Sequence, residues 1–170
     1  MNQKHISSSV AIDRISAHFS AAHILVSDHY EEGLHGHNYL VGIEVEGSMD
    51  IHDMIVDFVF LENMLSEVLT EWDHFVLLPS KNKNMKIHEN KDNLEIVYGK
   101  RLYSIPKAEI KLLDCTNVTA ETLARLLGEK IQIYLKKETF WERIQALKVT
   151  IWEKSYYRAD YTIRTNSLES

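Results

Sequence analysis

Residues 31–47, EEGLHGHNYLVGIEVEG, contain the clearest strand of the sequence, and two histidines stand near its start. Over 38–46 the residues alternate between apolar and polar, which is the period of a half-buried strand. The apolar face carries Tyr39, Val41, Ile43 and Val45. Extending this alternation backwards places His35 and His37 on the same face. Because a buried imidazole needs partners for both nitrogens, two of them on one core face would be costly without a bound ligand.

A third histidine is available from the preceding part of the chain. Residues 9–24 are predicted to form a strand in which His23 lies near the end, next to the strand of the histidine pair. Two histidines alone are more typical of satisfied core side chains, but three imidazoles with one open position are typical of catalytic zinc. We therefore predict a Zn²⁺ site formed by His23, His35 and His37. His29, in a predicted loop, is the alternative third ligand.

The rest of the chain predicts two helices, a hairpin and two further strands. In chain order these are a helix over 58–72 capped by Asp57, a polar loop over 79–92, a hairpin over 93–106 that turns at Gly99-Lys100, a helix that starts near Asn117 or Thr119, and strands over 146–154 and 158–164. This order predicts an α+β fold with an antiparallel sheet, in a single domain over residues 1–170.

Composition limits the possible partners. The 170 residues include one cysteine, Cys115, so no intrachain disulfide can form and a cytoplasmic location is expected. The net charge is −6, and no segment combines Lys and Arg with aromatic residues, which argues against nucleic acid. No apolar run of about 18 residues and no secretory signal are present, so no membrane association is expected. A small anionic substrate is compatible with this charge, because a few local cations suffice to bind it.

Two further polar features lie outside the histidine strand. Asp73 directly precedes His74 after the first predicted helix, and an aspartate beside a histidine can orient the imidazole for proton transfer. Glu153 follows Leu147, Val149 and Ile151 on one strand face, where a carboxylate can accept hydrogen bonds from a guanidine-like ligand edge. Each feature by itself is more often a solvated pair or strand end, so both depend on the histidine cluster.

Together these residues resemble the family of 6-pyruvoyl-tetrahydropterin and 6-carboxy-tetrahydropterin synthases. The segments that carry the resemblance are FSAAH, HGHNY, MIVDF, WDH, NVTAETLA and the strand that reaches Glu153. The least familiar part is an insertion at about 79–106. The resemblance implies the tunnelling fold: each subunit supplies a four-stranded antiparallel sheet and two helices, trimers close their sheets into a barrel, and two trimers form a homohexamer with its sites between subunits.

The resemblance also implies roles for individual residues. It implies the three histidines as zinc ligands, Asp73 and His74 as a catalytic pair, and Glu153 as the anchor of the pterin ring. Thr119 and Glu121 match the segment that helps to line the pterin pocket. The implied substrate is 7,8-dihydroneopterin triphosphate. The cations that could bind its triphosphate are Arg14, Lys81, Lys83 and Lys154.

One departure from the family pattern concerns the catalytic base. The synthases carry a cysteine a few residues before HGH, whereas this chain has Glu31 and Glu32 there and its cysteine lies far away in sequence, where it is expected to be a small buried residue. The spacing E-x-x-H-G-H resembles a subgroup in which glutamate replaces the cysteine and the product is 6-hydroxymethyl-7,8-dihydropterin. The resemblance therefore implies Glu32 as the base, with Glu31 as the alternative.

Chemistry supports this change of product and leaves two alternatives. Cleavage of the C1′–C2′ bond of the side chain needs removal of the 2′-hydroxyl proton, for which a carboxylate is a sufficient base. The chain is thus expected to be a zinc-dependent lyase. The alternatives are formation of the 6-pyruvoyl or 6-carboxy product, and a non-catalytic pterin- or metal-binding homologue. A scaffold would need neither the Asp-His pair nor a glutamate beside the metal, which favours an enzyme.

Overall fold

The computed structural model describes residues 8–13 and 17–165. The long strand β3 (Glu31–Gly47) lies at the centre of a seven-stranded sheet. The other strands of this sheet are β1 (Ser8–Ile12), β2 (His18–Val26), β4 (Phe75–Pro79), β8 (Ile110–Leu113), β9 (Ile144–Lys154) and β10 (Tyr157–Arg164). They are ordered β10-β9-β3-β2-β4-β8, and β1 pairs with the C-terminal half of β3. The predicted strands over 38–46, 146–154 and 158–164 are present, and β3 begins earlier than predicted.

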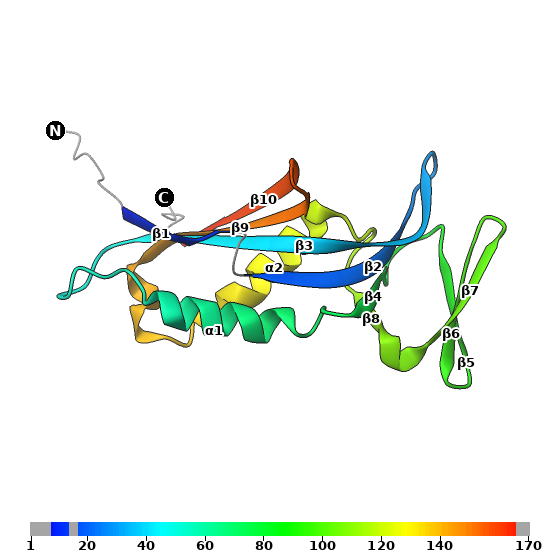
Figure 1. Ribbon diagram of the computed structural model, residues 1–170, viewed down its shortest axis with the longest axis horizontal. Helices are drawn as coiled ribbons and strands as arrows, with labels where there is room; N and C mark the ends of the chain where they lie inside the picture. Colours follow the sequence, from blue (N-terminus) through cyan, green and yellow to red (C-terminus); the bar gives the residue numbers. More distant parts are fainter. Residues whose placement is uncertain (1–7, 14–16, 166–170) are drawn as a thin grey trace, which may run out of the picture.

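Both helices lie on one face of this sheet (Figure 1). The helix α1 (Phe58–Leu69) begins at Asp57, whose carboxylate accepts hydrogen bonds from two backbone amides of the first turn, as predicted. The helix α2 (Ala120–Leu135) begins at Thr119, whose hydroxyl accepts from the amide of Thr122. The apolar stripes of the two helices pack on the apolar face of β3. The face that alternation predicted to be buried is therefore the one that packs in the core.

The first helix is shorter than the predicted 58–72. After Leu69 the chain forms a tight turn in which the amides of Trp72 and Asp73 both bond to the carbonyl of Leu69. Trp72 is still buried, with its ring edge-on to Phe19. Its apolar character therefore reflects core packing rather than continuation of the helix.

The predicted single strand over 9–24 was wrong, because the structure has two strands there. Both pair with β3: Ile12 is opposite Ile43, and His18 is opposite Leu40. These two pairs are six residues apart in the first segment but only three residues apart in β3. One continuous strand could not keep this pairing, because a regular ladder advances by one residue on each strand. The two strands nevertheless follow the same edge of β3.

The prediction of a four-stranded antiparallel sheet was also incomplete. β2 pairs with β4, and β4 with β8, in parallel, so the sheet is mixed. These two short strands were missed because runs such as Phe75–Pro79 show no alternation, and short apolar runs of this kind do not distinguish a buried strand from other core segments. In one chain the large sheet is open, with β10 and β8 as its outer strands.

The insertion forms a second, three-stranded sheet at one end of the molecule (Figure 1). Its strands are β5 (Lys86–Asn90), β6 (Asn93–Tyr98) and β7 (Arg101–Pro106). The hairpin and its Gly99-Lys100 turn were predicted, and Gly99 has a φ of 55°, which glycine adopts without strain. The prediction of a polar loop over 79–92 was partly wrong, because this segment contains β5. The strand has few apolar side chains and is held by backbone hydrogen bonds to β6. Short 3₁₀ turns lie at Lys107–Glu109 and Thr139–Arg143. Within the described residues, no helix has the length and hydropathy to cross a membrane.

Candidate metal and pterin site

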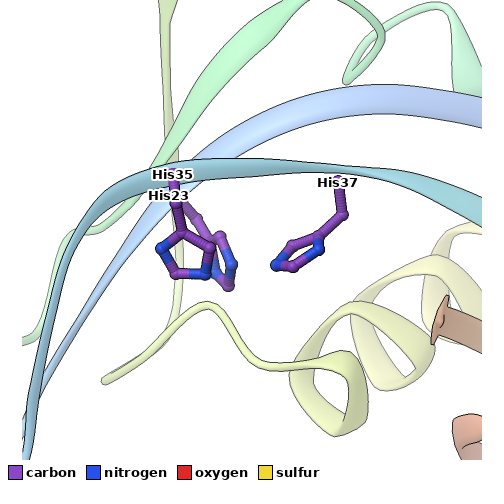
Figure 2. Close-up of side chains that lie close together, drawn as sticks. All are labelled: His23, His35 and His37. Carbon is purple, nitrogen blue, oxygen red and sulfur yellow. The ribbon is translucent and has the colours of Figure 1, made fainter.

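Three histidines from two neighbouring strands form a cluster on the helix-covered face of the sheet. His23 of β2 is directly opposite His35 of β3, and His37 follows two residues later on the same side. Their imidazoles point toward the segment that leads into α2 (Figure 2). One nitrogen from each ring lies within 4.8 Å of the others. The predicted ligands are thus brought together, whereas His29 lies exposed in a turn outside the cluster.

The hydrogen bonds of these rings prepare them for a metal ion. His23 Nδ1 donates to the carbonyl of Val118 at 2.7 Å, and His35 Nδ1 donates to the carbonyl of Gly33 at 2.8 Å. In a neutral ring, each bond selects the tautomer whose Nε2 carries no proton and can bind a metal ion. The Nε2 of His23 is buried and has no hydrogen-bond partner. An orphaned buried acceptor of this kind is costly unless a ligand satisfies it, so the donor set fits a metal ion.

Burial also keeps two of the rings in the neutral form that binds metal. Burial lowers the pKa of His23 below its usual value of 6.5, and the neighbouring imidazoles of His35 and His37 add to this effect. The pKa of His37 is lowered mainly by burial as well. A neutral imidazole at neutral pH is the required state of a ligand.

Glu153 reaches the same cluster from β9. Its Oε1 lies 3.4 Å from His37 Nε2 and 3.8 Å from His23 Nε2. The neighbouring Tyr39 has a fully buried hydroxyl without a hydrogen-bond partner, and burial raises the pKa of this hydroxyl. The strand-face pattern predicted that Glu153 continues a buried face, but nothing in the sequence marked Tyr39 as more than a core residue.

A β-bulge decides which of the two adjacent glutamates faces the histidines. His23 pairs with His35, but Leu25 pairs with Glu32, so one residue of β2 stands opposite two residues of β3. In a regular strand Glu31 would share the face of His35. The extra residue reverses this alternation, and Glu32 Oε2 lies 3.1 Å from His35 Nε2. Tyr30, which the sequence did not single out, donates a hydrogen bond to the other oxygen of Glu32.

The Asp-His pair lies next to Ser20 of β2. His74 Nδ1 lies 2.9 Å from Asp73 Oδ2, and Asp73 Oδ1 accepts from the amide of Ser20 at 2.7 Å, which holds the pKa of Asp73 below its usual value. His74 has a φ of 65°, a left-handed conformation that is strained for this residue type. The hollow beside it is lined by residues of β2, β3 and β4, and one of them is His37 of the cluster; the others are Ser20, Ala21, Ala22, Gly36, Asn38, Phe75 and Val76. Among the described residues, no hydrogen bond or ion pair links Asp73 or His74 to the three histidines.

The remaining predicted site residues are less directly connected with the cluster. Thr119 follows Val118, but its hydroxyl caps α2. Glu121 is exposed in the first turn of α2, where a carboxylate also stabilises the helix dipole. Cys115 is buried in the core, and burial raises its pKa to about 11, so it does not act as a displaced thiolate base.

The cations proposed for the triphosphate differ in their surroundings. Arg14 lies outside the described residues. Lys81 pairs with Asp114, and Lys83 lies 2.9 Å from Asp28. Burial has the largest effect in lowering the pKa of His37, and the positive charge of Lys154 lowers it further. Lys154 is therefore near the cluster.

Comparisons with known proteins identify relatives of this chain. The family model of 6-pyruvoyl tetrahydropterin synthase matches residues 14–164. The chain is 32% identical over 149 residues to a Pyrococcus horikoshii protein provisionally named a 6-carboxy-5,6,7,8-tetrahydropterin synthase, covering 85% of this chain and 87% of that one. A Pyrococcus abyssi protein with the same provisional name is 31% identical over 147 residues, covering 85% of each.

Solved structures show the same fold at lower identity. The Plasmodium vivax 6-pyruvoyl tetrahydropterin synthase superposes with a TM-score of 0.89 at 22% identity, over 94% of this chain and 99% of that one. A variant of the Plasmodium vivax enzyme in which alanine replaces a catalytic glutamate gives a TM-score of 0.84 at 23% identity over the same shares. The three-histidine strand pair, the matched family model and the shared fold lead to one conclusion: this chain belongs to the 6-pyruvoyl tetrahydropterin synthase family, whose members are lyases that act on pterins.

Proposed function

We propose that the protein is a zinc-dependent lyase that cleaves 7,8-dihydroneopterin triphosphate to 6-hydroxymethyl-7,8-dihydropterin, a step of folate and pterin biosynthesis. The observation that carries this proposal is the position of Glu32, whose carboxylate lies 3.1 Å from His35 Nε2 where the cysteine synthases would supply a thiol. The catalytic glutamate of the Plasmodium vivax enzyme gives a precedent in this fold. The archaeal relatives favour 6-carboxy-tetrahydropterin formation as the second candidate.

The chain's residues account for the proton movements of this cleavage. A zinc ion held by His23, His35 and His37 would supply Lewis acidity toward the hydroxyl oxygens of the side chain. Glu32 accepts the proton of the 2′-hydroxyl, and C2′ becomes the aldehyde carbon of a two-carbon triphosphate fragment. The C1′–C2′ bond breaks, its electron pair moves to C1′ in conjugation with the dihydropterin ring, and protonation of C1′ gives the hydroxymethyl product. We assign this second proton transfer to His74, oriented by Asp73.

Because no hydrogen bond or ion pair of the described residues links the Asp-His pair to the histidine cluster within one chain, we propose that each complete site combines two chains. The open sheet edges and an exposed apolar segment support assembly. The exposed apolar residues of this segment are Met49, Ile51, Met54, Phe58 and Val59. We expect a homohexamer, two trimers whose sheets close into barrels. Light scattering should give about six times the chain mass of 19.8 kDa. A stable monomer at micromolar concentration would contradict both the barrel and the shared sites.

Glu153 is expected to anchor the pterin rather than the metal. Zinc in catalytic sites needs three protein ligands, and the histidines supply them, which leaves the carboxylate available for the amino-pyrimidinone edge. Loss of a charge-assisted hydrogen bond costs about 1.5–3 kcal/mol, so Glu153→Ala should weaken pterin binding at least about 10-fold in calorimetric titration. Zinc content should be unchanged. Glu44→Ala, on the opposite face of the sheet beside Lys148, is the matched control. Unchanged pterin affinity in Glu153→Ala would refute the assignment.

Product identification tests the proposed reaction directly. The zinc-loaded protein is incubated with 7,8-dihydroneopterin triphosphate, and the pterins are separated by chromatography and identified by mass. We expect 6-hydroxymethyl-7,8-dihydropterin. A 6-carboxy or 6-pyruvoyl product would overturn the reaction while leaving the metal site standing, and absence of turnover with bound pterin would favour the non-catalytic homologue.

A further inference from the structure

The bulge in β3 releases backbone groups that the second sheet satisfies. Because Gly33 and Leu34 together face one residue of β2, the regular ladder is interrupted between Glu32 and His35. The amide of Leu34 donates to the hydroxyl of Tyr103, with 3.4 Å between N and Oη. The carbonyl of Glu32 accepts from the hydroxyl of Tyr98, also at 3.4 Å. Two tyrosines of the β6–β7 hairpin therefore contact the backbone on both sides of the extra residue.

These two tyrosines are themselves held in place. Tyr98 is buried in a second hydrophobic core, which is separate from the core under the helices and includes Ile24 of β2 and Ile96 of β6. Its ring stacks with Tyr103 at a centroid distance of 6.0 Å and an interplanar angle of 15°. Arg101 Nη1 donates to the Tyr98 hydroxyl at 3.3 Å. The hydroxyls thus approach β3 from a packed and hydrogen-bonded platform rather than from a free loop.

The same platform holds the other glutamate away from the histidines. Arg101 Nη2 lies 3.7 Å from Glu31 Oε1, and the hairpin turn at Gly99 lies against the same carboxylate. Val26, which pairs with Glu31, belongs to the second core. Glu31 therefore shares the face of β2 and β3 that the second sheet covers, whereas Glu32 shares the face of the histidine cluster.

We propose that Tyr98, Tyr103 and Arg101 are positioning residues that lock the bulge and so direct Glu32, instead of Glu31, to the metal site. This inference rests on the proposed function in giving Glu32 a catalytic role. The insertion would then be the element that allows a glutamate to replace the family's cysteine, because it sets the backbone register from which the longer side chain reaches the site.

Amide exchange tests the lock without reference to catalysis. In the metal-free protein, the double variant Tyr98→Phe/Tyr103→Phe should increase the hydrogen–deuterium exchange rate of the Leu34 amide about 10-fold, because a hydrogen bond that restrains this backbone is lost. Tyr134→Phe removes a tyrosine hydroxyl on α2 that bonds to Glu67, and it serves as the matched control. Unchanged exchange in the double variant would overturn the proposal.

Kinetics test whether the lock acts through Glu32. The double tyrosine variant should lose about 10- to 100-fold in kcat, with KM, zinc content and the thermal midpoint close to wild type, because a misaimed base impairs the proton transfer only. Combined with Glu32→Gln, the tyrosine changes should cause no additional loss. Additive losses would show that the tyrosines act elsewhere and would overturn the positioning role, whatever the product. An unexpected wild-type product with non-additive losses would overturn the proposed reaction alone.

Discussion

His35→Ala is expected to abolish stoichiometric zinc binding while the protein remains folded. The zinc affinity should fall by more than the 10- to 100-fold that is typical of losing an outer-shell partner, because a direct ligand is removed and two imidazoles remain. His35 is only partly buried and lies at the bulged end of β3, so the core around α1 and α2 should survive the change. Metal analysis after dialysis measures the zinc content, and circular dichroism measures the fold.

The control for this experiment is His29→Ala. His29 is exposed in the turn before β3, with its amide bonded to Ser27, and it lies outside the cluster. Its replacement should leave one zinc per chain. Full zinc occupancy in His35→Ala, or loss of zinc only in His29→Ala, would contradict the assigned ligand set.

Glu32→Gln is expected to reduce turnover by about 10²- to 10⁴-fold, which is the usual contribution of a general base. The substitution preserves the size of the side chain and removes the basic oxygen near His35. Zinc content and pterin affinity should stay close to wild type, because neither is assigned to this carboxylate. Single-turnover measurements with 7,8-dihydroneopterin triphosphate, at enzyme excess, would resolve the remaining rate.

The neighbouring glutamate provides the matched comparison. Glu31 carries the same charge one residue earlier but lies beside Arg101 on the other face of the strand. Glu31→Gln should therefore change turnover by only a few-fold. Wild-type activity in Glu32→Gln, or a collapse confined to Glu31→Gln, would reverse the assignment of the base.

Local sequence patterns predicted those parts of the fold that depend on neighbours in the chain. Alternation over 38–46 identified the core face of β3, Asp57 marked the start of α1, and Gly99 marked the hairpin turn. For α2 the sequence offered Asn117 or Thr119, and the structure has Thr119. Each of these signals arises from side chains within a few residues of one another. The three histidines were also predictable, since strand parity places His35 and His37 together.

Of the strands that were missed, β4 and β8 depend on partners distant in sequence, whereas β5 pairs with its neighbour but lacks an apolar pattern. β4 and β8 are short parallel strands. β4 pairs with β2 and with β8, and no periodicity in the sequence predicts this pairing. β5 is a polar strand that is stabilised by its ladder with β6. The sequence also paired Asp73 with His74 correctly, but it could not show that this pair has no hydrogen bond or ion pair with the histidines among the described residues of one chain.

The sequence by itself determined which chemical groups the candidate site contains. Only the tertiary structure decided which of the two glutamates faces the histidines. Three imidazoles, an Asp-His pair and two adjacent glutamates can be read from residue types and spacing. Regular alternation from His35 would have placed Glu31 beside the three histidines, and it is the bulge against β2 that places Glu32 there instead. A single extra residue reverses every side chain beyond it, and its position depends on the pairing with β2 and on contacts from the inserted hairpin, which is remote in sequence.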